Sequence, residues 1–428
     1  MAEDKRAEDQ IKMGSILVVG GGISGLTATL EAAEVGYEVF LVEKNPYLGG
    51  RVVQLKHYFP KLCPPTCGLE INFRRIKDNP RIKYFTLAEV ESVSGVPGNY
   101  EVAIRLNPRY VNEKCTCCGE CAKVCAIELS NEFNFDMDTR KGAYLPHEMA
   151  FPMRYVISPD IIGTEDAKRC KEACKYDAID LDMQPKTITL RVGAIIWATG
   201  WKPYDATKID NLGFGRYKNI ITNMMMERLA SPNGPTKGKI VRPSDSKEPA
   251  SVAFLQCSGS RDENHLPYCS YICCMASLKQ ATYIREQYPD AKVYVFYIDI
   301  RAPGQRYEKF YRKLKEDENV ILIKGKAAEV REDPKTMDIT VVAENTLTGE
   351  RIEQTVEMVV LATGMEPNTA GMKLPAGMKY TEEGFILSDF EKGGMFAAGC
   401  ASRPADVVSC NQNATAMALK AIQTLVKK

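Results

Sequence analysis

Cysteines carry the clearest chemical signal in this sequence of 428 residues. Of its fifteen cysteines, four follow a C-x2-C-x2-C-x3-C spacing: Cys115, Cys118, Cys121 and Cys125. This spacing occurs among the ligands of bacterial iron–sulfur clusters, where the fourth cysteine serves a second cluster if two are present. It lets three thiolates from one short loop face a single cube of iron and sulfide. The pattern therefore predicts a [4Fe–4S] cluster.

A later motif contains Cys170 and Cys174 and is followed by Ala178-Ile179. In ferredoxin-like domains, the last cysteine before such a segment completes the cluster that the first motif begins. We therefore expect one [4Fe–4S] cluster with these ligands: Cys115, Cys118, Cys121 and Cys174. The later motif lacks its own first two cysteines, so a second complete cluster is not expected in this segment. Cys125 and Cys170 are then remnants that can pair with each other, and they are the alternative ligands.

Further cysteines leave their roles open. Cys63 and Cys67 enclose two prolines that stiffen the turn, and their spacing differs from the redox C-x-x-C motif. They either present thiols to a cofactor or an additional cluster, or belong to a packed loop. A second group lies farther along the chain: Cys257, Cys269, Cys273 and Cys274. Its thiols either ligate or contact a cofactor, which includes a possible second cluster. The alternative is that they act as small buried apolar groups.

The overall composition excludes several classes of protein. Hydrophobic residues make up 45% of the chain and the formal net charge is +1, values typical of an ordinary soluble protein without a nucleic-acid footprint. No stretch approaches the roughly 18 apolar residues of a membrane span. The N-terminus is charged and lacks the apolar core of a secretory signal, so we expect metal or thiol chemistry in the cytoplasm rather than a disulfide scaffold. Only three histidines are present, which disfavours a histidine-based metal or acid–base site.

The segment that must position a second cofactor runs from Ile16 to Glu43. An apolar run leads into Gly20-Gly21-Gly22-Ile23-Ser24-Gly25, and a helical stretch and a second apolar strand follow. This G-x-G-x-x-G in its strand–turn–helix–strand setting is the dinucleotide-binding fingerprint. The pyrophosphate is expected at the helix N-terminus, where unpaired N–H groups and the helix dipole favour an anion.

Each residue of this fingerprint has an expected role. Gly20 allows the tight turn, and Gly22 lets the backbone approach the pyrophosphate. Gly25 lets the helix and strand pack closely. Glu43 follows the first glycine by about 20 residues, where an acidic side chain takes the ribose hydroxyls.

Later segments are expected to complete a flavin site. In flavoproteins with two dinucleotide-binding domains, a Gly-Gly pair after the acidic residue passes close to the flavin; the alternative here is a surface turn. Two strands end in Ala-Thr-Gly, and Cys400 stands where an aspartate usually holds the ribityl chain, a role that Asp406 or backbone groups can take over. The expected binding residues of these segments are Lys44, Gly49, Gly50, Arg51, Ala198, Thr199, Gly200, Gly364, Gly399 and Cys400.

A second βαβ-like pattern begins at Ser251. It stands where disulfide-reductase-like flavoproteins have their nicotinamide domain. Its turn, Cys257 to Arg261, lacks the glycines that let a backbone approach a pyrophosphate. NAD(P)H binding is therefore not expected at this turn.

These patterns predict an α/β fold with two dinucleotide-binding domains, as in disulfide and thioredoxin reductases, and an inserted ferredoxin-like α+β domain. We expect a polar tail at 1–14 and a degenerate nicotinamide-type domain at 241–368. The ferredoxin-like insertion is expected at 107–185. The FAD-binding domain is expected in three parts, at 15–106, 186–240 and 369–428.

Together these motifs resemble the HdrA family, the flavin subunits of heterodisulfide reductases. The matching segments are VVGGGISG, the cysteine loop before residue 70, the ferredoxin-like insertion, QCSGSRDE…YCSYICCMASLK, YIDIRAPGQRYEKFY and MFAAGCA. They cover nearly the whole chain. The sequence starts at the flavin domain and stops after its last helix, so we expect the shortened layout of the QmoA branch, from the quinone-interacting membrane-bound oxidoreductase of sulfate reducers.

The resemblance implies FAD and iron–sulfur centres that relay electrons between menaquinol and adenylylsulfate (APS) reductase in dissimilatory sulfate reduction, with no catalytic side chain. It implies a QmoB-like flavin/iron–sulfur partner and a QmoC-like membrane haem partner, which would hold the protein at the inner face of the cytoplasmic membrane. The alternative is an HdrA-type subunit of a heterodisulfide reductase or flavin-based electron-bifurcating complex. Missing nicotinamide glycines disfavour a stand-alone NAD(P)H-dependent disulfide reductase, and the intact motifs disfavour a cofactor-free scaffold.

Overall fold

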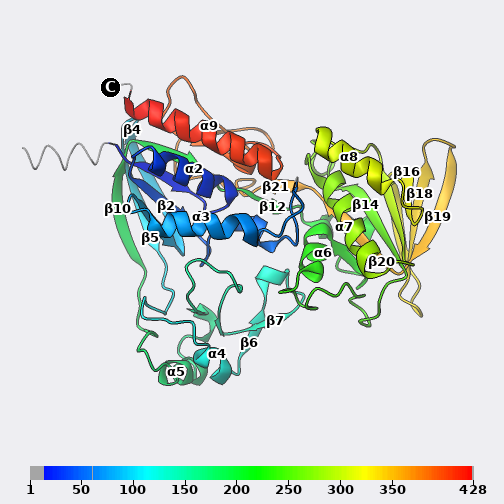
Figure 1. Cartoon of the computed structure of the whole chain (residues 1–428), viewed down its shortest axis with the longest axis horizontal. Coiled ribbons are helices and arrows are strands. Elements are labelled where there is room, and N and C mark those ends of the chain that lie inside the picture. Colours follow the sequence, from blue (N-terminus) through cyan, green and yellow to red (C-terminus); the bar gives the residue numbers. More distant parts are fainter. Residues whose placement is uncertain (1–13, 60, 427–428) are drawn as a thin grey trace, which may run out of the picture.

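The computed structural model of this chain describes residues 14–59 and 61–426. Two sheets with their helices lie side by side along the long axis of the molecule, and an insertion projects from the first of them (Figure 1). Of the polar tail expected at 1–14, only Gly14 lies within the described residues.

The first domain is built on a five-stranded parallel sheet with the strand order β24-β11-β1-β2-β3. Its strands are β1 (Ile16–Val19), β2 (Val39–Glu43), β3 (Ile82–Thr86), β11 (Ala194–Trp197) and β24 (Met395–Ala397). Strands that are buried on both faces of a parallel sheet form continuous apolar runs, and β1 and β11 are such runs.

Three helices cover one face of this sheet, and a small antiparallel sheet covers the other (Figure 1). The helices are α2 (Ile23–Glu34), α3 (Thr66–Asp78) and α9 (Val407–Val426). The antiparallel sheet has the order β10-β5-β4 and consists of β4 (Ala88–Val96), β5 (Asn99–Leu106) and β10 (Lys186–Val192). One apolar core, with Leu26 and Leu41, lies under the helices. Another, with Phe40 and Trp197, lies under the antiparallel sheet.

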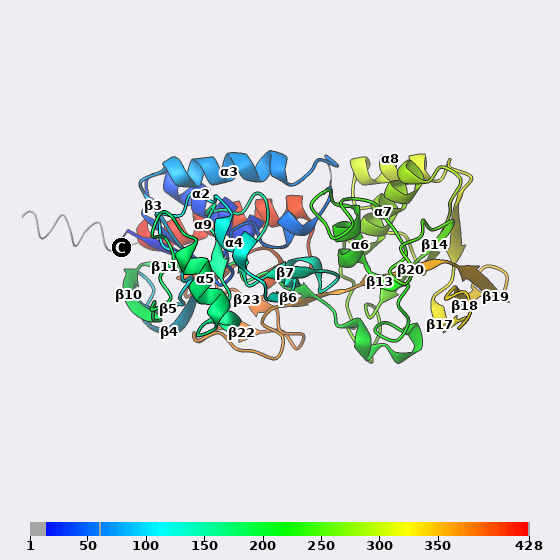
Figure 2. The same ribbon diagram turned by 90° about the horizontal axis from the view of Figure 1, so that it is seen from below.

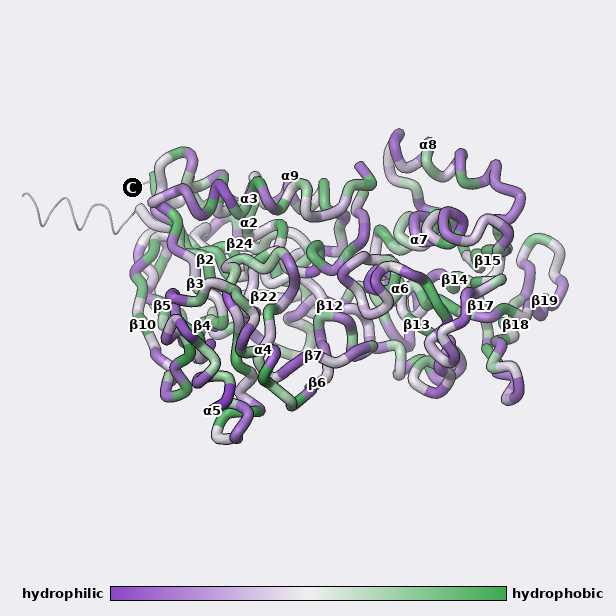
Figure 3. Tube along the Cα trace, turned by 60° about the horizontal axis from the view of Figure 1, so that its bottom comes forward, coloured by the Kyte–Doolittle hydropathy of each residue, from purple (hydrophilic) through white to green (hydrophobic). Residues whose placement is uncertain are grey.

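The second domain repeats this plan with the strand order β13-β20-β14-β15-β16, again parallel throughout. The strands are β13 (Ile220–Thr222), β14 (Ser251–Ser258), β15 (Lys292–Tyr297), β16 (Val320–Lys324) and β20 (Met358–Thr363). The helices are α6 (Asn223–Ala230), α7 (Cys273–Gln287) and α8 (Gln305–Leu314). An antiparallel sheet adds β17 (Ala327–Glu332), β18 (Ile339–Asn345) and β19 (Glu350–Val356). The hydrophilic α8 lies on the outside, whereas β14 inside the sheet is hydrophobic (Figure 3).

The chain crosses between the two domains twice, and the two crossings pair with each other. They are the short antiparallel strands β12 (Trp201–Pro203) and β21 (Met365–Pro367). Trp201 lies opposite Pro367 in this register. Each crossing directly follows an Ala-Thr-Gly strand end, so both strand ends face the space between the domains.

Residues between β5 and β10 form the insertion, which lies below the first sheet in Figure 1 and in front of it in Figure 2. Its helices are α4 (Glu120–Val124) and α5 (Glu165–Glu172), and its strands are β6 (Glu128–Ser130), β7 (Thr139–Lys141), β8 (Ala143–Tyr144) and β9 (Val156–Ile157). The strands pair as two short ribbons, β6 with β7 and β8 with β9. A further ribbon, β22 (Lys379–Tyr380) with β23 (Ile386–Leu387), precedes β24.

Candidate functional site

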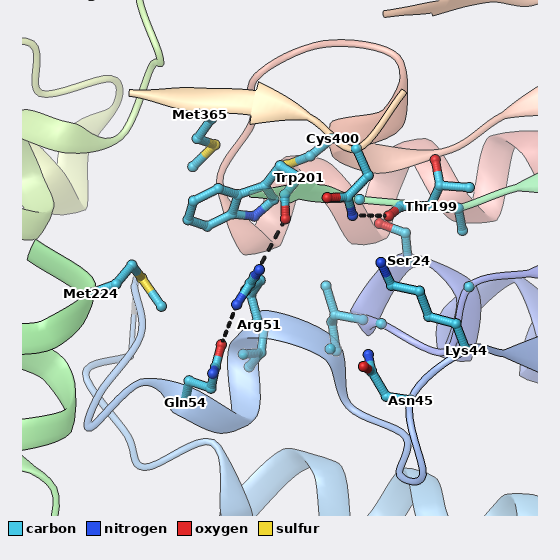
Figure 4. A pocket seen from close by; sticks show the side chains of 18 of the residues that line it. Ser24, Lys44, Asn45, Arg51, Gln54, Thr199, Trp201, Met224, Met365 and Cys400 are labelled. Atoms are coloured by element: carbon cyan, nitrogen blue, oxygen red, sulfur yellow. Dashed lines mark hydrogen bonds between the residues drawn. The ribbon is translucent and has the colours of Figure 1, made fainter. Parts of the chain in front are cut away.

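A cavity of about 700 Å³ opens where the two domains and the insertion meet (Figure 4). This volume is within the range of cofactor sites, roughly 300–1,000 Å³. The first domain supplies the glycine turn, the second supplies α6 and α7, and the insertion supplies aromatic side chains such as Phe133 and Tyr144. Of the residues expected to bind a cofactor, those on its surface are Gly20, Gly22, Ile23, Ser24, Glu43, Lys44, Gly50, Arg51, Ala198, Thr199, Gly200 and Cys400.

In the glycine turn, Gly20 and Gly25 are required for packing within the protein, whereas Gly22 is not. A Cβ on Gly20 would lie 2.2 Å from the Ala198 carbonyl oxygen, and a Cβ on Gly25 would lie 1.7 Å from the Gly20 carbonyl oxygen. At Gly22 the nearest atom, the Cα of Gly50, would be 3.8 Å away. Gly22 also precedes α2 without any side-chain cap. Its open backbone and the uncapped helix N-terminus fit a pyrophosphate.

Four expected binding residues are not on the cavity surface: Gly25, Gly49, Gly364 and Gly399. They lie where backbone or side chains approach closely instead. A Cβ on Gly364 would lie 2.3 Å from the Ser260 hydroxyl, and one on Gly399 would lie 2.0 Å from the Ser24 hydroxyl. Their glycine identity is thus explained by packing around the cavity.

Glu43 is buried at the end of β2 and holds the glycine turn itself. Its carboxylate accepts hydrogen bonds from the Gly21 amide at 2.6 Å and from the backbone and side-chain nitrogens of Asn45 at 2.7 and 2.8 Å. Burial raises the pKa of this carboxyl group, and the bonds from Asn45 and Gly21 oppose that rise. Sequence reasoning missed Asn45, which also lines the cavity.

Arg51 points into the cavity wall between the crossing strand and a short helix (Figure 4). Its Nη1 donates to Gln54 Oε1 at 3.0 Å, and its Nε donates to the Trp201 carbonyl oxygen at 3.4 Å. Burial lowers the pKa of this guanidinium. The expected Gly-Gly-Arg segment therefore places a cation at the cavity, as a phosphate-bearing or anionic ligand requires.

Several buried polar atoms on the cavity wall lack a hydrogen-bond partner among residues 14–59 and 61–426. They are Thr199 Oγ1, Trp197 Nε1 and Gln280 Oε1. A buried polar group without a partner costs free energy, so these atoms fit a ligand that hydrogen-bonds to them. Together with the open glycine turn, they show that the residues present suit a dinucleotide such as FAD.

The second domain contributes a buried ion pair to the cavity that the sequence did not indicate. Lys279 on α7 lies 2.9 Å from Glu227 on α6, and both side chains are almost fully buried. Gln280 Nε2 donates to the same carboxylate at 2.6 Å, and Tyr283 Oη donates to it at 3.3 Å. Glu227 and the three α7 residues come from separate segments, and only the packing of α6 on α7 brings them together.

A close pair of thiols lies where the ribityl aspartate was missing. Cys400 Sγ and Cys410 Sγ are 3.6 Å apart, and both line the cavity. Asp406, the expected substitute, is also buried there; its carboxylate accepts a hydrogen bond from the Ser409 amide at 2.8 Å and one from Tyr307 on α8. Asp406 thus joins the start of α9 to the second domain.

The four expected cluster ligands surround one small pocket in the insertion. Its wall contains Cys115, Cys118, Cys121 and Cys174, with Val111, Tyr155 and Ile179. Within the described residues, no three His, Cys, Asp or Glu side chains converge closely enough to hold a single metal ion. A cubane cluster binds each thiolate to a different iron, so its ligands stand farther apart. The apolar four-cysteine pocket therefore fits a [4Fe–4S] cluster.

A buried carboxylate lies beside Cys125 and Cys170, the two remaining cysteines of the insertion motifs. Asp166 accepts hydrogen bonds from the amides of Ala126 and Ile127 at 2.8 and 2.5 Å, and the Cys125 thiol lies 3.6 Å from it. Cys170 is buried next to Cys125. Burial is the larger cause and the neighbouring Cys125 thiol the smaller cause that raise the pKa of Cys170 to about 12. The Asp166 carboxylate thus holds the backbone just after Cys125 in place.

The four cysteines of the second domain gather at the start of α7. Burial and the neighbouring thiols raise the pKa of Cys257 to about 11, and they also raise the pKa of Cys273. Cys257 has φ 56° and Tyr271 has φ 69°, a strained conformation that often marks functional sites. Cys273 also lines the large cavity. In contrast, Cys67 at the start of α3 is exposed.

Comparison with known proteins identifies similar sequences and folds. Residues 15–60 match the model of the FAD dependent oxidoreductase family. Over 96% of its length, the chain is 40% identical to an iron-sulfur subunit of the CoB–CoM heterodisulfide reductase of Methanopyrus kandleri and covers 64% of it. Over 92%, it is 41% identical to the corresponding protein of Methanocaldococcus jannaschii and covers 61% of that protein. The chain thus spans less than two thirds of these relatives.

Solved structures agree with the fold. The thioredoxin reductase of Lactococcus lactis matches 97% of this chain and 99% of its own with a TM-score of 0.52 at 14% identity. The thioredoxin reductase of T. acidophilum matches 96% and 98% with a TM-score of 0.51 at 15% identity. Among the residues that the structure describes, no helix is both long and apolar enough to cross a membrane.

Proposed function

We propose that this chain, which is similar to iron–sulfur subunits of heterodisulfide reductases and has the fold of a two-dinucleotide-domain flavoprotein, transfers electrons between FAD and iron–sulfur clusters within a multi-subunit redox complex. One observation carries the proposal: the insertion that surrounds the four-cysteine pocket also forms a wall of the flavin cavity, through Phe133, Phe135 and Tyr144. The two cofactor sites therefore belong to one packed unit.

When bound, FAD accepts or donates one or two electrons, which couples two-electron donors to one-electron clusters. The residues of the chain bind FAD and tune its reduction potential. The start of α2 and Gly22 take the pyrophosphate, and Glu43 with Asn45 keeps the turn in shape. Arg51 places positive charge on the cavity wall, which favours the addition of electrons there, whereas the charge of Lys279 is paired with Glu227.

We assign one [4Fe–4S] cluster to the insertion, with Cys115, Cys118, Cys121 and Cys174 as ligands. The gathered thiols at the start of α7 support a second cluster, with Cys257, Cys269, Cys273 and Cys274 as ligands. A helix N-terminus lowers a thiol pKa, but burial dominates here and raises it. Such thiols stay protonated without a metal and lose their protons on ligation.

Partner proteins, rather than a nicotinamide nucleotide, are the proposed source and destination of the electrons. At the second-domain turn the cavity has a volume of about 50 Å³, which is far below the size of a nucleotide site. Its wall contains Cys257, Gly259 and His265 instead of a glycine fingerprint.

The named relatives favour a heterodisulfide-reductase type of complex over the quinone-linked complex that the sequence suggested. Each relative reported above is called a subunit of CoB–CoM heterodisulfide reductase. A further relative, 37% identical, is named as part of the H(2):CoB-CoM heterodisulfide,ferredoxin reductase of Methanothermobacter thermautotrophicus. QmoB-like and QmoC-like partners, APS reductase and attachment to a membrane through a partner remain predictions of the quinone-linked version.

Anaerobic purification with flavin, iron and acid-labile sulfide counted per chain tests the proposal. One FAD and about eight irons are expected, and about four irons would leave only the insertion cluster. Cys121→Ser should remove about four irons, whereas the matched control Cys117→Ser, outside the ligand set, should remove none. Flavin without iron, or bleaching of the flavin by NADPH alone, would contradict the proposal. Thiol-disulfide or quinone reduction by the co-purified complex distinguishes the two kinds of partner.

A further inference from the structure

Arg109 lies between the two cofactor sites, where the chain leaves the first domain and enters the insertion. It is only 7% exposed. We propose that Arg109 is a positioning residue whose buried positive charge raises the reduction potential of the insertion cluster. This inference rests on the proposed function and adds to it a residue that tunes the potential of that cluster.

The hydrogen bonds of Arg109 link both sites. Its Nη1 donates to the Arg154 carbonyl oxygen at 3.3 Å, and Arg154 directly precedes Tyr155 in the wall of the four-cysteine pocket. Its Nη2 donates to the carbonyl oxygen of Pro46, which lines the flavin cavity, and to Thr86 Oγ1 at 2.9 Å. One guanidinium group therefore contacts the backbone of a flavin-cavity residue and the backbone of a residue next to the cluster pocket.

The charge of this guanidinium has no acidic partner in the described part of the protein. Its three acceptors are two carbonyl oxygens and a hydroxyl, and none of the ion pairs within residues 14–59 and 61–426 includes it. Burial lowers the pKa of Arg109 to about 10, so the group stays charged at neutral pH. A buried cation without a counter-ion is costly, so a nearby anion is required.

In the proposal, the insertion cluster would supply that anion: Arg154, whose carbonyl oxygen accepts a hydrogen bond from Arg109, directly precedes Tyr155 in the wall of the four-cysteine pocket. Four thiolates on one cluster carry a net negative charge, and each added electron makes that charge larger. A nearby cation therefore stabilises the reduced cluster more than the oxidised one and raises its potential.

The neighbouring Arg154 provides a matched control. Its side chain is 24% exposed and lies 4.0 Å from Glu113, so its charge is partly compensated and better screened. Arg109 and Arg154 thus occupy the same region but differ in burial and pairing. Of the two, only Arg109 should strongly change the reduction potential of the insertion cluster.

Redox titration of the anaerobically purified protein, with the cluster followed by EPR and the flavin by absorbance, tests the inference. At a fixed potential, Arg109→Gln should lower the ratio of reduced to oxidised cluster about tenfold, equivalent to a 59 mV negative shift for one electron. Arg109→Lys keeps the charge and should stay near the unaltered protein. Arg154→Gln should change the ratio less than threefold.

A second variant separates charge from structure. Thr86→Asp replaces the hydroxyl that accepts one hydrogen bond from Arg109 with a carboxylate and leaves the bonds to the Arg154 and Pro46 carbonyl oxygens in place. It should shift the potential in the same direction as Arg109→Gln. If both variants keep the cluster at its original potential, the inference is wrong while the proposed function stands. If Arg109→Gln loses the cluster, the Thr86→Asp titration decides. Unaltered protein without iron would overturn both.

Discussion

The two dinucleotide-type turns of this chain begin alike and diverge within a few residues. In the first domain, β1 is followed by Gly20 to Gly25, and α2 begins inside that turn. In the second, β14 runs into Cys257 to Arg261, and α7 begins only at Cys273. A hydrogen bond of 2.8 Å between the hydroxyls of Ser260 and Ser270 closes the loop that lies between.

This difference shows how one scaffold changes its ligand. An immediate helix start points unpaired amides at the end of the strand, where a phosphate binds. The inserted loop of the second domain moves the start of α7 to the flavin cavity, and Cys273 lines that cavity. At the vacated strand end a cavity of only about 50 Å³ is left. The second turn thus presents thiols, not amides.

The largest effect is expected when the packing of the first turn is broken. Gly25→Ala should destabilise the first domain by about 3 kcal/mol and abolish flavin retention, because the added Cβ would lie 1.7 Å from a backbone carbonyl oxygen. Thermal unfolding and flavin content measure this. A stable, flavin-loaded variant would show that the turn relaxes.

A substitution in the open part of the same turn should spare the fold. Gly22→Ala should leave thermal unfolding unchanged but weaken FAD binding about 100-fold, or roughly 2.7 kcal/mol, because its Cβ has room within the protein and occupies the approach of the pyrophosphate. Titration of the apoprotein with FAD measures this. Gly377→Ala is the control, since a Cβ there would have no neighbour within 4 Å. Equal affinities would remove Gly22 from the binding site.

The packing of the insertion against the flavin cavity should be destabilised by acid. His147 in the insertion stacks on Phe133, a residue of the cavity wall, with ring centroids 5.0 Å apart. Burial, and to a smaller extent the positive charge of Arg228, lowers the pKa of His147 to about 4. Because the pKa is about 6.5 in the unfolded chain, the stabilisation is complete above that pH and is lost as pH falls towards 4.

At pH 5 the loss should reach about 1–2 kcal/mol. Denaturant unfolding at pH 7 and pH 5 compares the protein with His147→Gln, which should show a smaller difference between the two. An equal difference in both proteins would assign the acid sensitivity to other groups.

The smallest effect is expected at the second turn. Cys257→Gly should change the free energy of unfolding by less than about 1 kcal/mol, because relief of the strain at φ 56° is offset by the loss of a buried side chain. It should also lower the iron content by about four per chain if the second cluster is present. Unfolding and iron analysis are the measurements, and full iron content would exclude Cys257 as a ligand.

Sequence reasoning predicted the elements with local signatures. The prediction of two dinucleotide-type domains is confirmed by the similarity to thioredoxin reductases, because a strand, a glycine turn and a helix are coded within some thirty residues. The insertion pocket follows the same logic, since the spacing of Cys115, Cys118 and Cys121 on one loop places them in the wall of one pocket.

Features assembled from distant segments were not predictable. Glu227, Lys279 and Tyr283 have no spacing that reveals their contact, which depends on the packing of α6 on α7. No sequence motif singles out Arg109, because its acceptors Pro46 and Thr86 lie more than twenty residues away in the chain. Gly364 and Gly399 were expected to bind the cofactor because of their motif positions. In the structure they allow close packing against Ser260 and Ser24, which lie far from them in the chain.

The order of strands in the first sheet has a consequence for synthesis. Its central strands β1 and β11 are separated by more than 170 residues, and its edge strand β24 and helix α9 come last. On the ribosome, the insertion is a contiguous segment and emerges long before them. The cluster site therefore has its ligands available early, whereas the flavin site closes only after α9 is made. Maturation should begin with iron and finish with FAD.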